Sequence, residues 1–354
     1  MHAPDRANWP RPISPLWFPR LPPLLVRNLP WIALILLSIT FAEFLTGSTF
    51  VLLPLLDPIS AAFLVGLYGA GVLLVREASV RWRKGWPTVL LLGAAYGIAE
   101  EGLGTKTFFG PIGVGHLGTY GHWLGVNWVW ATELALFHAI FSIALPIAVV
   151  EIVFPATQGV PFLRSRRSLA ATVAAFLLTV TAMYFLFNPT ETPSGALVLA
   201  SIGAIAGLVV LARRVPASLG GWGIRSTGAP LPVRPALLGA VFVWGFFGIA
   251  WLGSSVIPIS EVVTVGLIAW CLLFGVEVVR HRETFQAPGT RVAFIWGALT
   301  LSLVLASVET IFGDYGAPVV VGSVILLGWR LRRGLPVATS AQAPVTLGQS
   351  RPLV

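Results

Sequence analysis

Apolar runs of about 20 residues, separated by short polar stretches, fill most of the chain. A helix of about 20 residues crosses the hydrocarbon core of a bilayer, so each run is a candidate transmembrane helix. The pattern therefore predicts an all-α, polytopic integral membrane protein with about ten transmembrane helices. We expect them at residues 29–45, 59–75, 86–102, 126–149, 169–187, 194–211, 235–255, 262–279, 292–311 and 317–331.

The apolar runs form a single helical transmembrane domain, residues 29–333, between two more polar ends. Residues 1–28 are rich in proline and arginine, and the first apolar run starts too late for a secretory signal. We therefore expect a cytoplasmic N-terminal arm. Residues 334–354 have the composition of a disordered cytoplasmic tail. After the first run, residues 47–58 predict a turn and a short apolar segment, and the pattern leaves open whether that segment is re-entrant.

The basic residues gather in alternate polar stretches, after the second, fourth, sixth, eighth and tenth runs. Lys106 is the exception, because it falls in a stretch on the other side. The positive-inside rule then places both termini in the cytoplasm. This topology explains the net charge of +9 without nucleic acid as a partner. The expected partners are the lipid bilayer and, at the cytoplasmic face, anionic lipid headgroups.

The acidic residues show the opposite distribution, since most of them map to outer ends, outer loops or outer halves of the runs. One explanation of the bias is that acidic side chains are tolerated near interfaces. The alternative is an outward-facing cavity that attracts a cation or a cationic substrate. The acidic residues concerned are Glu43, Asp57, Glu100, Glu101, Glu133, Glu191, Glu261, Glu309 and Asp314.

Residues 94–151 bring the most ionisable side chains into apolar surroundings. Glu100 and Glu101 end the third run, and Glu133 and His138 lie inside the fourth. Ionisable groups at membrane depth are costly, so they indicate a functional site. Further candidates in this region are Tyr96, Lys106, His116 and His122.

Helix geometry restricts which of these residues can meet. On an α-helix, Glu133 and His138 diverge by about 140°, so the partner of His138 must come from the third run. Glu101 points about 100° away from Glu100. His138 lies near the membrane midplane and the glutamates near the outer end, so a shared site needs a deep third helix or a bent fourth one. The glycine-rich connection between them can fold over such a site as a lid.

The chemistry of this group leaves several possibilities open. One glutamate can act as a general base beside a protonated neighbour, and Glu101 with His138 can bind a divalent metal such as zinc. Alternatively, the two glutamates cap an interfacial helix end and His138 bonds a backbone carbonyl. His116 and His122 fit solvated loop histidines. Lys106 fits either a counter-ion to a glutamate or a side chain that reaches the interface.

Five segments carry a first resemblance: AEFLTGST, YGAGVLLVRE, LLLGAAYGIAEEG, GVNWVW and FHAIFSIALPI. Together they resemble a group of uncharacterised polytopic membrane proteins of prokaryotes, over roughly the first 155 residues. The resemblance implies the prokaryotic cytoplasmic membrane, the cell inner membrane, as the location. It implies no known activity.

The order of the acidic and histidine positions is similar to a second family, the CAAX-type and bacteriocin-processing intramembrane proteases. That family has E-E-x-x-x-R, then F-x-x-x-H, then H-x-x-x-N or D. Glu100 and Glu101 match the first motif, but Thr105 stands in place of the arginine. His138 matches the second histidine, with Leu134 in place of the phenylalanine. No apolar run supplies a third histidine. The resemblance implies a peptidase-like site of Glu100, Glu101 and His138.

Three functions therefore compete. The first is an intramembrane, glutamate-dependent peptidase-like hydrolase with an outward-facing site of Glu100, Glu101 and His138. The second is a cation- or proton-coupled transporter that uses the same residues together with Glu133. The third is a membrane scaffold without catalysis. The substrate is not predicted by any feature of the sequence.

Overall fold

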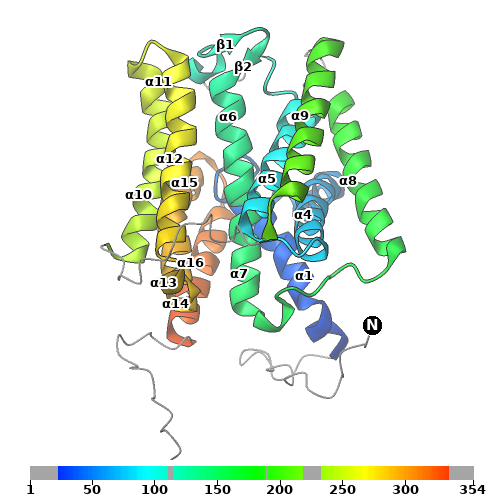
Figure 1. The fold of residues 1–354 in the computed structure, drawn as a ribbon, viewed down its shortest axis with the longest axis vertical. Helices are drawn as coiled ribbons and strands as arrows, with labels where there is room; N and C mark the ends of the chain where they lie inside the picture. Colours follow the sequence, from blue (N-terminus) through cyan, green and yellow to red (C-terminus); the bar gives the residue numbers. More distant parts are fainter. Residues whose placement is uncertain (1–22, 111–114, 189, 191, 218–232, 335–354) are drawn as a thin grey trace, which may run out of the picture.

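The computed structural model describes residues 23–110, 115–188, 190, 192–217 and 233–334. Nearly all of these residues are helical, and the long helices run along the long axis of the molecule (Figure 1). Two short strands, β1 (His122–Trp123) and β2 (Val126–Asn127), pair as an antiparallel hairpin. Apart from this hairpin, the prediction of an all-α protein is confirmed for the described residues.

Six helices in the described part of the chain are long and apolar enough to cross a membrane. A seventh span results if α14 (Pro288–Ala298) and the helix Thr300–Phe312, which meet at a 43° bend, are counted as one. The protein is therefore a multi-pass membrane protein. The six helices are Pro58–Arg81, Trp128–Val153, Arg166–Leu186 (α8), Gly195–Arg214 (α9), Pro235–Val256 and Ser260–Arg280 (α12).

Several of these spans contain more than one element. The first consists of α3 (Pro58–Leu64), η3 (Val65–Gly69) and α4 (Ala70–Arg81), and the second of α6 (Trp128–Phe137), η6 (His138–Ala144) and α7 (Leu145–Val153). The span Pro235–Val256 consists of α10 (Pro235–Phe247), η9 (Gly248–Leu252) and α11 (Gly253–Val256). The helix that follows α14 at the bend consists of α15 (Thr300–Glu309) and η10 (Thr310–Phe312). The connections hold α2 (Leu53–Leu56), η5 (Gly115–Gly118), η7 (Pro155–Thr157) and α13 (Arg282–Gln286).

The other three predicted spans are also helical, but they are shorter or less apolar than these six helices. They are α1 (Pro23–Ile39) with η2 (Thr40–Phe44), α5 (Trp86–Gly97) with η4 (Ile98–Gly104), and α16 (Ala317–Gly334). Two glutamates interrupt the apolar sequence of η4, and three arginines that of α16. The number of ten spans, the orientation and the lengths of the arm and tail stay predictions.

Two details differ from the expected boundaries. Helix α1 begins at Pro23, inside the segment predicted as an arm, and continues through Pro30. The segment after η2 contains one short exposed helix, α2. Just before α2, the amide of Val51 donates a hydrogen bond to Asp314 Oδ2 at 3.0 Å. The rest of the predicted arm, and the tail beyond residue 334, lie outside the described residues.

The helix from α6 to α7 is the centre of the bundle (Figure 1). In its apolar stretch of 18 residues, 72% of the residues are buried. The corresponding share is 11% in α8 and in α9, which are therefore peripheral. Phenylalanines of α6, η6 and α10 form one core on one side of it, among them Phe137, Phe141, Phe242 and Phe246. A second core joins α1, α4, α5 and α7 on the other side.

Two glycines let α5 lie directly against the central helix. A Cβ on Gly93 would lie 2.7 Å from Ala139 Cα, and one on Gly97 would lie 3.1 Å from Ala135 Cα. Small residues allow such close backbone contact between membrane helices. The end of α5 is therefore held against η6, and this contact positions the site described next.

Candidate functional site

Four π-helical segments meet at one buried polar cluster. η2 contributes Glu43, η3 contributes Tyr68, η4 contributes Glu100 and Glu101, and η6 contributes His138. A π-turn inside an α-helix is uncommon and is frequently found at functional sites. The coincidence of four such segments at one place indicates that the local backbone is shaped by the cluster.

The imidazole of His138 lies between the two adjacent glutamates. Its Nδ1 is 3.2 Å from Glu100 Oε2, and its Nε2 is 3.2 Å from Glu101 Oε1. The side chains of His138 and Glu100 are each 3% exposed, and that of Glu101 is 12% exposed. One donor atom from each of the three residues lies within 4.8 Å of the others. The cluster is thus compact and shielded, with Glu101 as its most accessible member.

Each of these three side chains is also held by a hydroxyl group. Glu101 Oε2 accepts hydrogen bonds from Thr105 Oγ1 at 2.8 Å and from Thr107 Oγ1 at 2.5 Å. Glu100 Oε1 accepts one from the Tyr68 hydroxyl. His138 Nδ1 lies 2.9 Å from Ser142 Oγ. Consequently one oxygen of each glutamate is anchored, and the other oxygen faces the imidazole.

The imidazole is also fixed by its neighbours. The ring of Tyr96 meets it edge-on at 5.8 Å, and the ring of Phe137 does so at 5.2 Å. Ser142 is held in turn, because its carbonyl accepts a hydrogen bond from Ser38 Oγ at 2.7 Å. These contacts restrict the rotation of His138, so its two nitrogens stay directed at the two glutamates.

Glu100 and Glu101 were expected to diverge by about 100° on an α-helix. Residues 98–104 are instead π-helical, and the larger number of residues per turn makes the angle between consecutive side chains somewhat smaller. The two glutamates reach opposite nitrogens of the same histidine. As helix phase required, the partners of His138 come from the third predicted span and Glu133 is not among them.

The remaining candidates lie apart from the cluster. Glu133 is buried on α6, and its Oε1 accepts a hydrogen bond from Trp251 Nε1 at 2.9 Å. Lys106 is neither a counter-ion of the glutamates nor at the surface: it is buried, donates to the Asn188 carbonyl at 2.9 Å and lies over the Tyr184 ring. His122 is exposed on β1. The side chain of His116 lies outside the described residues.

The sequence pattern did not predict Tyr68, Thr105 and Thr107 as members of the site, and it indicated Glu43 only as one acidic residue among several. A tyrosine in an apolar run is an ordinary observation, and its hydroxyl gives no signal until its neighbours are known. The threonines gave a weak signal, because they directly follow the glutamate pair in a glycine-rich connection.

The fold and the site together define the class: a multi-pass membrane protein with a buried glutamate–glutamate–histidine cluster. Residues 32–346 match the model of a family described as an uncharacterized membrane protein family, and the chain belongs to that family. No curated protein and no solved structure matches the chain. The family match supports the first resemblance and extends it over most of the chain. The resemblance to the CAAX-type proteases gains no support from the comparisons.

Proposed function

We propose that Glu100, Glu101 and His138 bind a divalent metal ion, with zinc as the first candidate, and that the protein is an intramembrane metal-dependent hydrolase. The observation that carries the proposal is the donor set itself. Two carboxylates and an imidazole, from two helices, have donor atoms within 4.8 Å of one another in a buried place.

The donor chemistry fits a zinc-type site. Bonds of about 2.0–2.2 Å in a tetrahedral site place the ligand atoms roughly 3.4 Å apart. The distance from His138 Nε2 to Glu101 Oε1 is 3.2 Å, but Glu100 Oε2 faces the other nitrogen, Nδ1, so one carboxylate must shift for a single metal to meet all three donors. Metal-binding side chains are usually held by further hydrogen bonds. Here the hydroxyl contacts to all three side chains meet that requirement.

The charge of the cluster also favours a bound cation. When both carboxylates are ionised, the cluster carries a net negative charge, whether the histidine is neutral or protonated. Among the described residues, no lysine or arginine forms an ion pair with Glu100 or Glu101. Buried charge without compensation is strongly destabilising. A divalent metal would supply the missing positive charge.

The three side chains leave a fourth position for water, which is the pattern of catalytic zinc sites. When bound, the metal would make a water nucleophilic at neutral pH and polarise a carbonyl group. Ser142 orients His138, and Thr105 and Thr107 hold Glu101 so that its free oxygen faces the centre. Because both threonines lie in the connection after η4, substrate would reach Glu101 from that side, which is the outer side in the predicted topology. The peptidase class rests on the motif that begins with Glu100 and Glu101.

The first test is metal analysis of the full chain, purified in detergent and loaded with zinc. We expect about one metal ion per chain in the wild type, and its loss in Glu101→Gln. Glu133→Gln is a matched control, since it removes a buried carboxylate on the helix that carries His138 but outside the cluster. No bound metal, or equal metal in wild type and Glu101→Gln, would overturn the proposal.

A second candidate function is a cation- or proton-coupled transporter, and one observation favours it. Glu133 is a buried carboxyl outside the cluster, and its Oε2 has no hydrogen-bond partner among the described residues. Isolated intramembrane carboxyls commonly carry protons in transporters. Gradient-dependent uptake into proteoliposomes that is lost in Glu133→Gln would favour transport over hydrolysis. A scaffold without chemistry would tolerate both glutamine substitutions.

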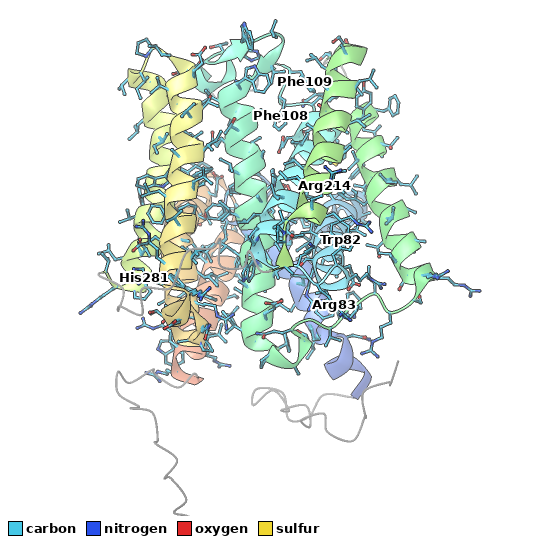
Figure 2. All side chains as sticks on the ribbon, in the orientation of Figure 1. Trp82, Arg83, Phe108, Phe109, Arg214 and His281 are labelled. Atoms are coloured by element: carbon cyan, nitrogen blue, oxygen red, sulfur yellow. The ribbon has the colours of Figure 1, made fainter. Side chains whose placement is uncertain are left out.

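The topology belongs to the same proposal: ten spans, both termini in the cytoplasm, and the cytoplasmic membrane of a prokaryote. One feature supports the division of the loops between two opposite faces. Arg83 and His281, in stretches predicted to be cytoplasmic, lie in the lower half of Figure 2, whereas Phe108 and Phe109, in the connection predicted to be outside, lie near the top. The basic residues of the lower end would then contact anionic lipid headgroups.

A further inference from the structure

We infer that Tyr68 and Glu43 are positioning residues of the metal site, which hold Glu100 in the orientation that binds the metal. The inference rests on the proposed metal site and extends it from two helices to four. It assigns a role to a tyrosine and a glutamate that the glutamate–histidine motif does not contain.

Tyr68 lies where it can act on only one oxygen of Glu100. Its side chain is buried, and its hydroxyl contacts Glu100 Oε1. The other oxygen, Oε2, faces His138 Nδ1 at 3.2 Å and makes no hydrogen bond with a described residue. Tyr68 therefore fixes the carboxylate by one oxygen and leaves the other available as a ligand. Thr105 and Thr107 do the same for Glu101.

The ring of Tyr68 is held firmly enough for this role. It lies 6.3 Å from the ring of His138 and 6.2 Å from that of Tyr96. It belongs to η3, where the π-turn displaces the backbone from regular helix geometry. Because the tyrosine packs on the histidine that it serves, a shift of either side chain would disturb the other.

Glu43 fixes the tyrosine from the opposite side. The Tyr68 hydroxyl lies between Glu43 Oε1 and Glu100 Oε1, and Glu43 Oε2 accepts a hydrogen bond from Thr49 Oγ1 at 2.5 Å. Glu43 is half-buried at the end of the first helix. A chain of contacts therefore runs from Thr49 through Glu43 and Tyr68 to Glu100. Groups that hold metal ligands in this way contribute roughly 10- to 100-fold to metal affinity.

A merely structural role predicts a different result. If Tyr68 only links the helices that it contacts, loss of its hydroxyl changes the stability of the metal-free protein but not the affinity for the metal. Metal affinity and the spectrum of the bound metal distinguish the two roles, because both report on the geometry of the ligands. Cobalt(II) is a suitable probe, since it replaces zinc in such sites and absorbs visible light.

The experiment is a cobalt(II) titration of the detergent-purified full chain, followed by its visible absorption and by competition with zinc. We expect Tyr68→Phe to weaken binding roughly 10- to 100-fold and to change the absorption band. Glu43→Gln should weaken it by a smaller factor, because the glutamine amide can still donate a hydrogen bond to the Tyr68 oxygen, whose single proton is directed at Glu100. Tyr184→Phe, which removes a tyrosine hydroxyl outside the site, should bind like the wild type.

The outcomes separate this inference from the metal proposal. If the wild type binds cobalt, Glu101→Gln does not, and Tyr68→Phe binds with wild-type affinity and spectrum, Tyr68 is structural and the inference fails alone. If wild type and Glu101→Gln behave alike, both proposals fail. If Tyr68→Phe shows no cooperative unfolding transition, it is not folded, and the cobalt(II) affinity of Glu43→Gln is the test instead. An affinity of Glu43→Gln equal to that of the wild type would then overturn the inference.

Discussion

The contact between His138 and Glu101 predicts strong energetic coupling between the two residues. The perturbation is a double-mutant cycle with His138→Ala, Glu101→Gln and the double variant, measured on the metal-free protein. Nε2 and Oε1 are 3.2 Å apart and both side chains are shielded from solvent. Two unit charges 3.2 Å apart interact by roughly 5 kcal/mol at an effective dielectric constant of 20, which is an upper bound for this pair.

The expected coupling is smaller than that bound, because the remaining partners rearrange. After Glu101→Gln, the histidine keeps Glu100 and Ser142, and the amide oxygen of the introduced glutamine can still accept the two threonine hydrogen bonds. Residues in one hydrogen-bond network show coupling energies of about 0.5–3 kcal/mol. With two carboxylates competing for one imidazole, we expect about 1–3 kcal/mol for this pair.

Equilibrium unfolding in mixed detergent micelles, with a chelator present, measures the four free energies. The control cycle pairs His138→Ala with Glu133→Gln, because Glu133 bonds Trp251 and shares no described partner with His138. The control pair should be additive within about 0.5 kcal/mol. Additivity of the His138 and Glu101 pair within the same margin would refute the reasoning, since the two residues would not share a site.

Three further predictions follow from other parts of the fold. Gly93→Ala places a Cβ 2.7 Å from Ala139 Cα and should lower the unfolding free energy by about 1–3 kcal/mol. Gly207→Ala, inside α9 and with nothing within 4 Å of the added Cβ, should not lower it in the same unfolding assay. A cysteine at Ser165, in a chain with Cys271 replaced, should react with an impermeant reagent only after permeabilisation, and reaction in intact cells would reverse the topology. Arg76→Leu should lower the unfolding free energy by about 2–4 kcal/mol, because the buried guanidinium donates to two carbonyls of the connection after α7. An unfolding midpoint equal to that of the wild type would show that those hydrogen bonds contribute nothing.

Helix positions were predictable from the sequence because each depends only on a local apolar run. All ten runs are helical, with ends that move by a few residues. Whether α5 with η4 crosses the bilayer could not be decided in this way, because Glu100 and Glu101 lower its apolarity while the fold buries them. Local pattern does not report burial by neighbouring helices.

The site was predictable in composition and not in geometry. Ionisable residues among apolar ones singled out Glu100, Glu101 and His138, and helix phase correctly excluded Glu133 as the partner. A shared site of these three residues was predicted, but the π-turn that carries the two glutamates was not, because it depends on tertiary contacts that a local sequence pattern does not report. Lys106 was misassigned for a similar reason, since its carbonyl partner at Asn188 lies 82 positions along the chain.

The π-helical turns tie the site to the exact spacing of residues along the chain. Such a turn holds one residue more than an α-turn, so removing a single residue from η4 or η6 would restore a regular helix at that point. The apolar face beyond it would rotate by about 100°, and the imidazole would no longer meet both carboxylates. A relative could thus retain every helix and still lack the cluster through a one-residue deletion. Gap positions within residues 98–104 and 138–144 are therefore a simple criterion for sorting members of the family that can form this cluster from those that cannot.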